Sequence, residues 1–419
     1  MTKVLSTVHG GISGFPYGNR AAINKQIAIN KGLFDAGCHA RVLNRKGVYT
    51  GDPSETPDAS GIFEGIEFET ATGRADRPKG FLTRNLAKIK GWRREVSYLK
   101  ELRKRGELDA MILDSSHIDS ILFYRWITRR MGIPLVYHYV EMRSKVSMAD
   151  QKHNFNQRIS NQTIDKYVHK LFDGILAISD VLAQHVKSLD PQLPTMTISA
   201  LCDYTKFEIP RSESPEPFFL YCGAAAYSEV IKFVMDSFNQ LNRPDDLQLY
   251  MIISGAKATR QAVYDYADSL ECRDKIQFFY MIPYEELAQK YRDAKALLIP
   301  LRDTIQDKAR FPHKVSEYLA SQNPVVTTNY GELAKYFTDL DNGLVADSYN
   351  LDQYAEKLQW VIDNPQEAKA IGMRGYEMGR QNFHYQSTGV KVRDFLADLS
   401  GKSIEGSVGE QKVAASSID

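Results

Sequence analysis

Residues 310–320 read Arg-Phe-Pro-His-Lys-Val-Ser-Glu-Tyr-Leu-Ala, and residues 324–328 read Pro-Val-Val-Thr-Thr. Proline fixes a helical φ and has no N–H group to satisfy, so Pro312 suits the first turn of a helix over 313–321. The apolar, β-branched run that follows is typical of a buried parallel strand. A helix followed closely by such a strand predicts one unit of an α/β fold.

The start of this predicted helix can bind an anion. The backbone N–H groups of His313, Lys314 and Val315 are expected to lack helical partners, so they would form a phosphate site beside the Lys314 ammonium. Glu317 lies one turn further on, where its carboxylate can accept hydrogen bonds from two ribose hydroxyls. The alternative is an ordinary core helix that carries a solvated Lys–Glu pair.

Short apolar runs alternate with helical patterns along the chain, which predicts α/β units around parallel sheets. The expected strands are 4–9, 39–44, 66–70, 109–114, 134–140, 173–178, 194–199, 218–222, 247–254, 276–281, 296–300, 324–328 and 343–346. The expected helices are 19–36, 85–105, 117–131, 155–171, 180–188, 229–241, 258–270, 284–292, 313–321, 332–338, 351–363, 366–381 and 386–399. Most of 48–80 is expected to be loop.

A cluster of proline, serine and charged residues at 202–217 predicts a domain break. We expect one Rossmann-like domain over 1–205 and a second over 218–383, facing each other across a cleft. A last helix would occupy 384–400. Residues 401–419 are small and polar, so we expect a disordered tail.

Composition limits the class of protein. A chain of 419 residues can build two domains, and its formal net charge of +1 argues against a general nucleic-acid binder. The four cysteines lack metal-ligand spacing, so reduced thiols and no metal site are expected. We find no secretion signal, no apolar run of membrane-spanning length and no Walker motif. The chain is therefore expected to be cytoplasmic and to carry no bound cofactor.

Two stretches of the first half carry candidate site residues. Gly11 and Gly14 precede the first helix, where glycines let the backbone approach a ligand and a helix start favours anions. His138 and Glu141 stand at the end of the expected strand 134–140, and ligands of α/β sheets bind beyond the carboxyl ends of strands. Either residue could bind sugar hydroxyls or influence charge at a reacting carbon. A structural role, in a loop or at a strand end, is the alternative for all four.

Residues 84–105 combine nine basic side chains with apolar residues at helical spacing, among them Ile89, Trp92, Val96, Leu99 and Leu102. Such a helix can lie on anionic lipid through its basic residues and its tryptophan. It can equally be a surface helix that packs its apolar stripe on the sheet. Both interpretations stay open from the sequence.

The pattern Phe-Pro-x-Lys-x-x-Glu-Tyr at 311–318, with the Pro-Val-Val that follows, resembles the donor-binding segment of retaining GT-B glycosyltransferases of the group 1 (GT4) family. Further segments stand in the expected order at 221–223, 252–255, 276–278, 296–300 and 342–345. The resemblance extends over 218–383 and is looser in the first half. It implies the GT-B fold, with an acceptor side in the first domain, a donor side in the second, and a last helix that crosses back to the first domain.

The resemblance also implies an activity. The expected enzyme is a retaining, hexosyltransferase-type glycosyltransferase that moves a sugar from a nucleotide-diphosphate donor to a saccharide or lipid-linked saccharide acceptor, in cell-surface polysaccharide biosynthesis. It would act in the cytoplasm or at the inner face of the membrane. The implied donor-binding residues are Gly11, Gly14, Gly223, His313, Lys314, Val315 and Glu317, and the implied catalytic residues are His138 and Glu141. Arg302 and Arg310 are additional candidates for phosphate or sugar contacts.

Three positions depart from the family pattern. Ala224 and Glu229 stand where the family has an Arg and a Lys that bind the diphosphate, and Ala309 stands where it has a Glu that contacts the donor sugar. Losing both cations should weaken neutralisation of the diphosphate unless Arg302, Arg310 or Lys314 substitutes. A sugar-nucleotide epimerase on the same fold, or a degenerate glycosyltransferase that acts as a scaffold, are therefore the alternatives.

Overall fold

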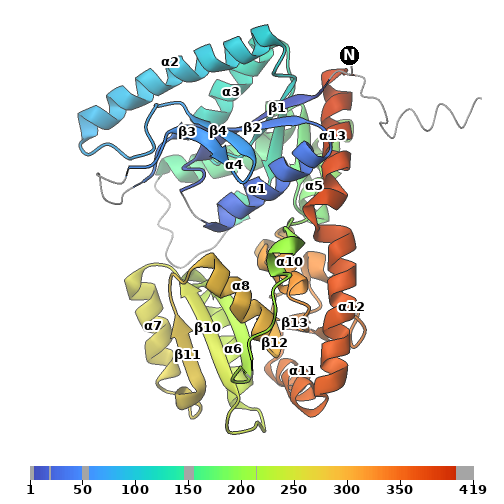
Figure 1. Cartoon of the computed structure of the whole chain (residues 1–419). Helices are drawn as coiled ribbons and strands as arrows, with labels where there is room; N and C mark the ends of the chain where they lie inside the picture. Colours follow the sequence, from blue (N-terminus) through green and yellow to red (C-terminus); the bar gives the residue numbers. More distant parts are fainter. Residues whose placement is uncertain (1–3, 18–19, 50–55, 146–154, 214, 403–419) are drawn as a thin grey trace, which may run out of the picture. The chain divides into compact units, whose positions relative to one another are not determined.

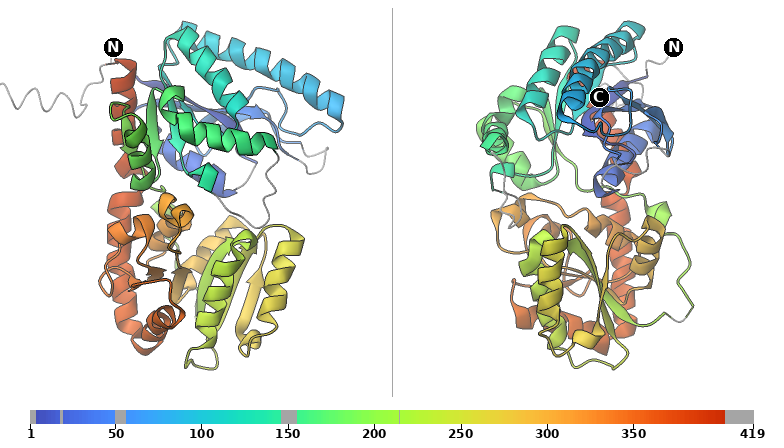
Figure 2. Two further views of the ribbon diagram at one scale, coloured as in Figure 1. Left: turned by 180° about the vertical axis from the view of Figure 1, so that it is seen from behind. Right: turned by 90° about the vertical axis from the view of Figure 1, so that its left-hand side faces the viewer.

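The structure is a computed structural model, and it describes residues 4–17, 20–49, 56–145, 155–213 and 215–402 (Figures 1 and 2). The chain forms two compact units. Unit 1 comprises Met1–Ser144, Asn154–Leu201 and Tyr385–Asp419, and unit 2 comprises Lys145–His153 and Cys202–His384. The predicted linker at 202–217 is thus grouped with unit 2, and the last helix with unit 1. The predicted disordered tail lies outside the described residues from 403 onward.

Unit 1 is built on an eight-stranded sheet with the order β3-β4-β2-β1-β5-β6-β7-β8. Its strands are β1 Ser6–Ser13, β2 His39–Lys46, β3 Ser60–Phe63, β4 Ile66–Thr70, β5 Ala110–Leu113, β6 Leu135–Tyr139, β7 Gly174–Ala177 and β8 Thr195–Thr197. All neighbouring strands are parallel except β3 and β4, which form an antiparallel pair at one edge. Central strands such as β5 are buried at every position, which accounts for their uninterrupted apolar sequences.

Helices cover this sheet. They are α1 Arg20–Asp35, α2 Phe81–Arg105, α3 Ile118–Met131, α4 Phe155–Leu171, α5 Asp180–Leu189 and α13 Tyr385–Ser400. The last helix, α13, lies against α1 (Figure 1), and a Cβ atom on Gly389 would come within 2.1 Å of the Gly32 carbonyl oxygen. This contact needs glycine at both positions, and it lets Leu33 and Leu396 pack on Ile112 in one core.

Unit 2 is built on a six-stranded parallel sheet with the order β11-β10-β9-β12-β13-β14. Its strands are β9 Phe218–Ala224, β10 Gln248–Ser254, β11 Ile276–Phe279, β12 Ala296–Ile299, β13 Val325–Thr328 and β14 Leu344–Ala346. Side chains alternate between the two faces. Phe219 and Tyr221 belong to the core beneath α6 (Ser228–Asn239) and α11 (Leu351–Asp363). The Cys222 backbone N–H donates to the Tyr318 hydroxyl of α10 (Lys314–Ala320) at 3.0 Å.

The helices of unit 2 are α6 Ser228–Asn239, α7 Lys257–Ala267, α8 Tyr284–Asp293, α9 Ile305–Ala309, α10 Lys314–Ala320, α11 Leu351–Asp363 and α12 Pro365–Phe383. Short 3₁₀ turns in the chain are η2 Arg143–Lys145, η3 Tyr204–Phe207, η4 Ala225–Tyr227, η5 Arg273–Lys275 and η6 Gly331–Lys335. Among the described residues, no helix is both long enough and apolar enough to cross a membrane.

In each sheet the first parallel strand lies in the middle. The chain proceeds from β1 toward β2 on one side and later toward β5 on the other, and it proceeds from β9 toward β10 on one side and later toward β12 on the other. Ligands of open α/β sheets bind beyond the carboxyl ends of the strands where the order reverses in this way. These topological switch points are β1/β5 in unit 1 and β9/β12 in unit 2.

Candidate functional site

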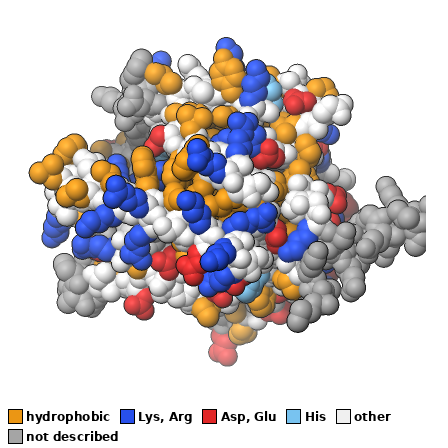
Figure 3. Space-filling view, turned by 90° about the horizontal axis from the view of Figure 1, so that it is seen from above, with side chains coloured by type: hydrophobic (Ala, Val, Ile, Leu, Met, Phe, Trp, Pro, Cys, Tyr) orange, Lys and Arg blue, Asp and Glu red, His pale blue; other side chains and the backbone are white. Residues whose placement is uncertain are grey.

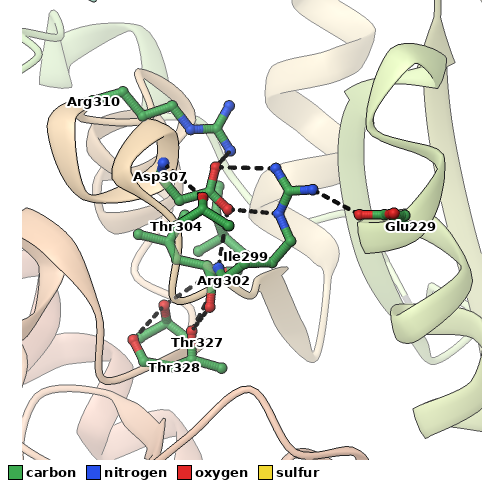
Figure 4. Close-up of polar contacts among 9 residues, drawn as sticks. Glu229, Ile299, Arg302, Thr304, Asp307, Arg310, Thr327 and Thr328 are labelled. Atoms are coloured by element: carbon green, nitrogen blue, oxygen red, sulfur yellow. Dashed lines mark hydrogen bonds and ion pairs between the residues drawn. The ribbon is translucent and has the colours of Figure 1, made fainter. Parts of the chain in front are cut away.

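In unit 2, the segment that leaves β12 at the switch point is fixed by two threonines of β13 (Figure 4). Thr327 Oγ1 donates to the Ile299 carbonyl at 2.9 Å. Thr328 Oγ1 donates to the Leu301 carbonyl at 2.6 Å and accepts from the Leu301 N–H at 2.8 Å. The threonine side chains of β13 therefore hold the chain in place beyond the last residue of β12. The backbone of the next residue, Arg302, is fixed as a result.

Asp307 organises the loop and the short helix α9 that follow. Thr304 caps α9 by accepting from the Asp307 N–H at 3.2 Å. The Asp307 carboxylate is fully buried, and its Oδ2 accepts from both the N–H and Nε of Arg302 at 2.9 Å. Its other oxygen lies 2.8 Å from Nη2 of Arg310. One buried carboxylate thus orients two guanidinium groups (Figure 4).

A second carboxylate, that of Glu229, binds the Nη1 group of Arg302. Glu229, in the first turn of α6, places Oε2 at 2.9 Å from Arg302 Nη1, and its own side chain is 79% exposed whereas that of Arg302 is 17% exposed. Burial opposes the charge of Arg302, but the hydrogen bonds with Asp307 and Glu229 raise its pKa. The positive charges of Arg302 and Arg310 are therefore matched by two carboxylates, of which only Glu229 faces solvent. We call Glu229, Arg302, Asp307 and Arg310 the arginine cluster.

Helix α10 begins at Lys314, close to the predicted start, and its first turn differs in one respect from the prediction. The Val315 N–H was expected to be unpaired, and this is wrong: it donates to the Pro312 carbonyl at 3.0 Å. Because Pro312 and His313 already form a turn, the Val315 N–H has a partner within the chain. The ligand roles predicted for His313 and Val315 stay predictions.

Two other predicted donor residues lie on α10. Lys314 is near the end of β9: burial raises the pKa of the Cys222 thiol, and the Lys314 ammonium lowers it in part. Glu317 is half-buried, and its Oε1 lies 3.3 Å from the hydroxyl of Tyr284. Gly223, also predicted as a donor residue, is the last buried residue of β9. Gly223 thus lies at the end of β9. The other four predicted residues lie after β12, with Arg302 and Arg310 on either side of α9 and Lys314 and Glu317 in α10.

In unit 1, both predicted glycines have a packing reason to be glycine. Gly11 has φ +75, its N–H donates to the Tyr124 hydroxyl at 3.1 Å, and a Cβ there would come within 2.6 Å of Leu113. Gly14 has φ +86, and a Cβ there would come within 2.0 Å of Val48. The irregular end of β1 and the turn that follows it therefore require these two glycines without reference to a ligand.

The two predicted catalytic residues differ in how far they are buried. Glu141 follows β6 and is half-buried, whereas His138 is only 2% exposed and its Nδ1 lies 3.9 Å from Asp114 Oδ2. Lys25 of α1 binds the same Asp114 oxygen at 2.8 Å, and His9 of β1 completes the group. Burial lowers the pKa of His138 and, to about 3, that of His9. Burial favours neutral Asp114, but Lys25 and the two imidazoles hold its pKa well below the usual range.

This group of His9, Asp114 and His138 has the donor atoms of a metal site, and these atoms lie within 4.8 Å of one another. The Lys25 ammonium, however, already binds the carboxylate and supplies the cation that it needs. Lys25 and Asp114 therefore form a buried ion pair, and the neutral imidazoles of His9 and His138 lie beside it. We call these four residues the histidine cluster.

The sequence pointed to Arg302 and Arg310 but not to the carboxylates that hold them. Asp307 had a local signal, because Thr304-x-x-Asp307 is a helix-capping pattern. Glu229 had been noted only as a departure from the family, and its contact with Arg302 spans 73 positions of sequence. Lys25, His9 and Asp114 carry no motif, since they meet only through the sheet order.

Comparisons with known proteins identify the class of this molecule. Sucrose-phosphate synthase from Thermosynechococcus elongatus superposes with a TM-score of 0.71 at 16% identity, covering 95% of this chain and 100% of that one. Anabaena HepE in complex with UDP-glucose gives 0.67 at 14% identity, covering 94% and 100%. The fold is therefore GT-B, as predicted.

Sequence comparisons point to the same class of protein. Residues 204–378 match the family described as Glycosyl transferases group 1. An uncharacterized glycosyltransferase of Methanocaldococcus jannaschii is 22% identical over 77% of this chain and 86% of its own length. A D-inositol 3-phosphate glycosyltransferase of Corynebacterium diphtheriae is 25% identical over 38% of this chain and 37% of its own length. Residues 204–378 thus match the group 1 glycosyltransferases, and these matches together support a transferase.

Proposed function

We propose that this protein is a retaining glycosyltransferase that transfers a sugar from a nucleoside diphosphate donor to a saccharide or lipid-linked saccharide acceptor, in the biosynthesis of a cell-surface polysaccharide. The observation that carries the donor half of the proposal is the arginine cluster at the β9/β12 switch point. It holds two guanidinium groups in fixed positions at the edge of the sheet where ligands of this fold class bind.

Arg302 is the residue proposed to bind the donor diphosphate. Asp307 fixes its Nε side, so the Nη1 group that now contacts Glu229 is the part that can be offered to a ligand. An ion pair with an exposed carboxylate contributes at most about 1 kcal/mol, so a diphosphate with two or more negative charges can replace Glu229 there. Arg302 would then take the place of the cations that the family has at 224 and 229.

Lys314 and Glu317 complete the proposed donor site. Lys314 adds a second cation near the end of β9, and Glu317 would accept hydrogen bonds from the ribose. As the bond between the anomeric carbon and the diphosphate breaks, negative charge grows on the leaving group, and fixed cations stabilise that charge more than they stabilise the bound substrate. Retention of configuration is proposed from the family. HepE in complex with UDP-glucose supports a nucleotide-sugar donor, and UDP is the first nucleotide to test.

The test is a thermal-shift measurement with UDP, GDP, ADP and CMP, because a ligand that binds only the folded state raises the melting temperature. We expect one nucleoside diphosphate to stabilise the wild-type protein and to lose its effect in Arg302→Ala. Lys308→Gln is the matched control, since Lys308 is a cation of the neighbouring helix α9 that pairs with Asp303 instead. Equal shifts in wild type and Arg302→Ala would contradict the assignment of Arg302.

The second candidate is a degenerate glycosyltransferase that acts as a scaffold. The observation that favours it is the charge balance of the arginine cluster, together with Ala309, which is 1% exposed at the end of α9 and offers no group to a donor sugar. The same thermal-shift screen separates the two candidates. A folded protein that no nucleotide or nucleotide sugar stabilises would favour the scaffold.

A further inference from the structure

The first half of α2 presents large apolar side chains to solvent. Phe81 is 72% exposed, Leu82 75%, Leu86 59% and Ile89 51%, and Trp92 is 42% exposed. The buried residues of α2 are Gly91, Glu95, Leu99 and Leu102, and Trp92 stacks on Phe123 of α3, so the helix packs on the unit from Gly91 onward. The sequence had offered membrane contact and packing on the sheet as alternatives. The structure divides the helix, with packing from Gly91 onward and an uncovered apolar face over the turns before it.

This helix is also the most strongly basic part of the chain. Over Phe81–Arg105 there are nine Lys and Arg against two Glu, a net charge of +7. The whole chain carries +1, so the remaining residues carry −6. One of the two acidic side chains, Glu95, is buried. Nearly all of the exposed charge on α2 is therefore positive, and it is interleaved with the apolar residues.

A hollow of about 490 Å³ lies between α2 and α3 beside this face. Cations line it from both helices: Lys100 and Arg103 come from α2, and Arg130 comes from α3. Trp126, which is 48% exposed, lies under the Arg130 guanidinium at 4.8 Å. Cationic walls around an apolar floor suit a molecule with an anionic head and a hydrocarbon tail.

We propose that the α2–α3 face binds the surface of a bilayer that contains anionic lipid. The first turns of α2 insert Phe81, Leu82 and Leu86 at the level of the headgroups, while the basic residues contact lipid phosphates. Figure 3 looks onto this side of the molecule and shows Lys and Arg side chains among hydrophobic ones. The helix lies on the membrane and does not cross it.

The charge is what selects lipid over a protein partner. Protein interfaces are depleted of lysine at their centres, whereas basic residues around an exposed apolar stripe are typical of helices on anionic membranes. The inference deepens the proposed function, because a membrane-bound enzyme would meet a lipid-linked acceptor at the bilayer. The role of membrane binding in catalysis rests on the proposed function, whereas the binding of the face to lipid does not.

The test is co-sedimentation of the full-length protein with vesicles of phosphatidylcholine alone or mixed with an equal part of phosphatidylglycerol. We expect binding to the mixed vesicles that weakens with salt. Leu82→Ser with Leu86→Ser should reduce the partition coefficient more than tenfold. Lys88→Gln, Lys90→Gln and Arg93→Gln together should reduce it by roughly fivefold for each charge. Met281→Ser is the control, because Met281 is an 80% exposed apolar residue of unit 2.

Four results would overturn the proposal: no sedimentation of the wild type, sedimentation of both α2 variants like the wild type, equal sedimentation with both kinds of vesicle, or self-association that the Leu82/Leu86 variant abolishes. The last would assign the face to a second copy of the chain. The thermal shift with nucleotides is measured on the same variants and should be unchanged. Vesicle binding should in turn persist in Arg302→Ala, so a failure of the donor site and a failure of the membrane face are distinguishable.

Discussion

The two switch points have the same topology and opposite electrostatic designs. In unit 1, Lys25 and Asp114 form an ion pair whose side chains are 11% and 15% exposed, with two neutral imidazoles beside it. In unit 2, Asp307 is fully buried, but the second carboxylate of the cluster, Glu229, is 79% exposed. The histidine cluster is closed to exchange with solvent ions, whereas the arginine cluster has one carboxylate that an incoming anion can replace.

This difference shows why a cluster of charges is not by itself a binding site. A charge that is buried with its partner is costly to separate and stabilises the fold only as a pair. A charge that is fixed on one side and paired with an exposed group on the other is held in place and remains exchangeable. By this criterion Arg302 is the stronger candidate for ligand binding, and Lys25 has a structural role.

The largest expected effect is on Asp307. Asp307→Ala leaves two partly buried guanidinium groups without their shared partner, and we expect it to lower the free energy of unfolding by about 3–5 kcal/mol. Chemical denaturation measures the loss. Asp303→Ala is the control from the same loop, because its 60% exposed carboxylate pairs with Lys308, and it should cost at most about 1 kcal/mol. Equal losses would show that Asp307 does not organise the cluster.

Lys25→Met tests the same idea in unit 1. It leaves the buried Asp114 carboxylate unpaired, and we expect a loss of about 3 kcal/mol at neutral pH. Lys25 holds the pKa of Asp114 below the unfolded value. The stability that the pair contributes is therefore present above the unfolded pKa and is lost as pH falls. The difference between variant and wild type should shrink in acid, and a difference that is constant with pH would refute the role of Lys25.

Glu95 gives a pH dependence of the opposite sign. Burial raises its pKa to about 7, although the Tyr124 hydroxyl and Arg45 lower it in part. Between the unfolded value near 4.5 and about 7, folded Glu95 holds a proton that the unfolded chain has lost, so its burial destabilises the fold as pH rises. Glu95→Gln should remove this effect and gain up to about 3 kcal/mol relative to wild type between pH 5 and pH 8. Parallel stability curves in denaturant titrations would show that Glu95 does not titrate in this range.

The smallest effect is expected for Glu229. Glu229→Gln removes the carboxylate that competes for Arg302, so the affinity for a nucleoside diphosphate should rise about two- to fivefold. Titration calorimetry measures the change. Glu286→Gln makes the same change of charge in the exposed Glu286–Lys290 pair of α8 and should leave the affinity unaltered. A comparable gain in both variants would mean that only net charge matters.

Much of the fold could be predicted because its signals are local. The strands expected at 39–44, 66–70 and 296–300 appear as β2, β4 and β12 within two residues at each end, since buried parallel strands are short apolar runs. Some short elements were not predicted. β3 pairs only with β4 at the sheet edge, α9 depends on the Thr304 cap, and 332–338 forms the 3₁₀ turn η6 instead of an α-helix.

The candidate site could be predicted only in part. Lys314, Glu317 and both arginines stood in or near a recognisable pattern, so their types and spacing were informative. The partners were not, because Glu229 reaches Arg302 only through the pairing of β9 with β12. His138 shows the converse limit: its place at a strand end suggested a ligand, but its side chain is buried beside Asp114.

The most direct test of the account is a double-mutant cycle on nucleoside diphosphate affinity, with wild type, Glu229→Gln, Arg302→Ala and the double variant measured by titration calorimetry. We expect Glu229→Gln to tighten binding in the wild-type background and to have no effect once Arg302 is absent, since the carboxylate competes for that guanidinium alone. Arg302→Ala should itself weaken binding about 10- to 100-fold. An equal effect of Glu229→Gln in both backgrounds, or unchanged affinity of Arg302→Ala, would contradict the claim that Glu229 holds the place of the donor diphosphate.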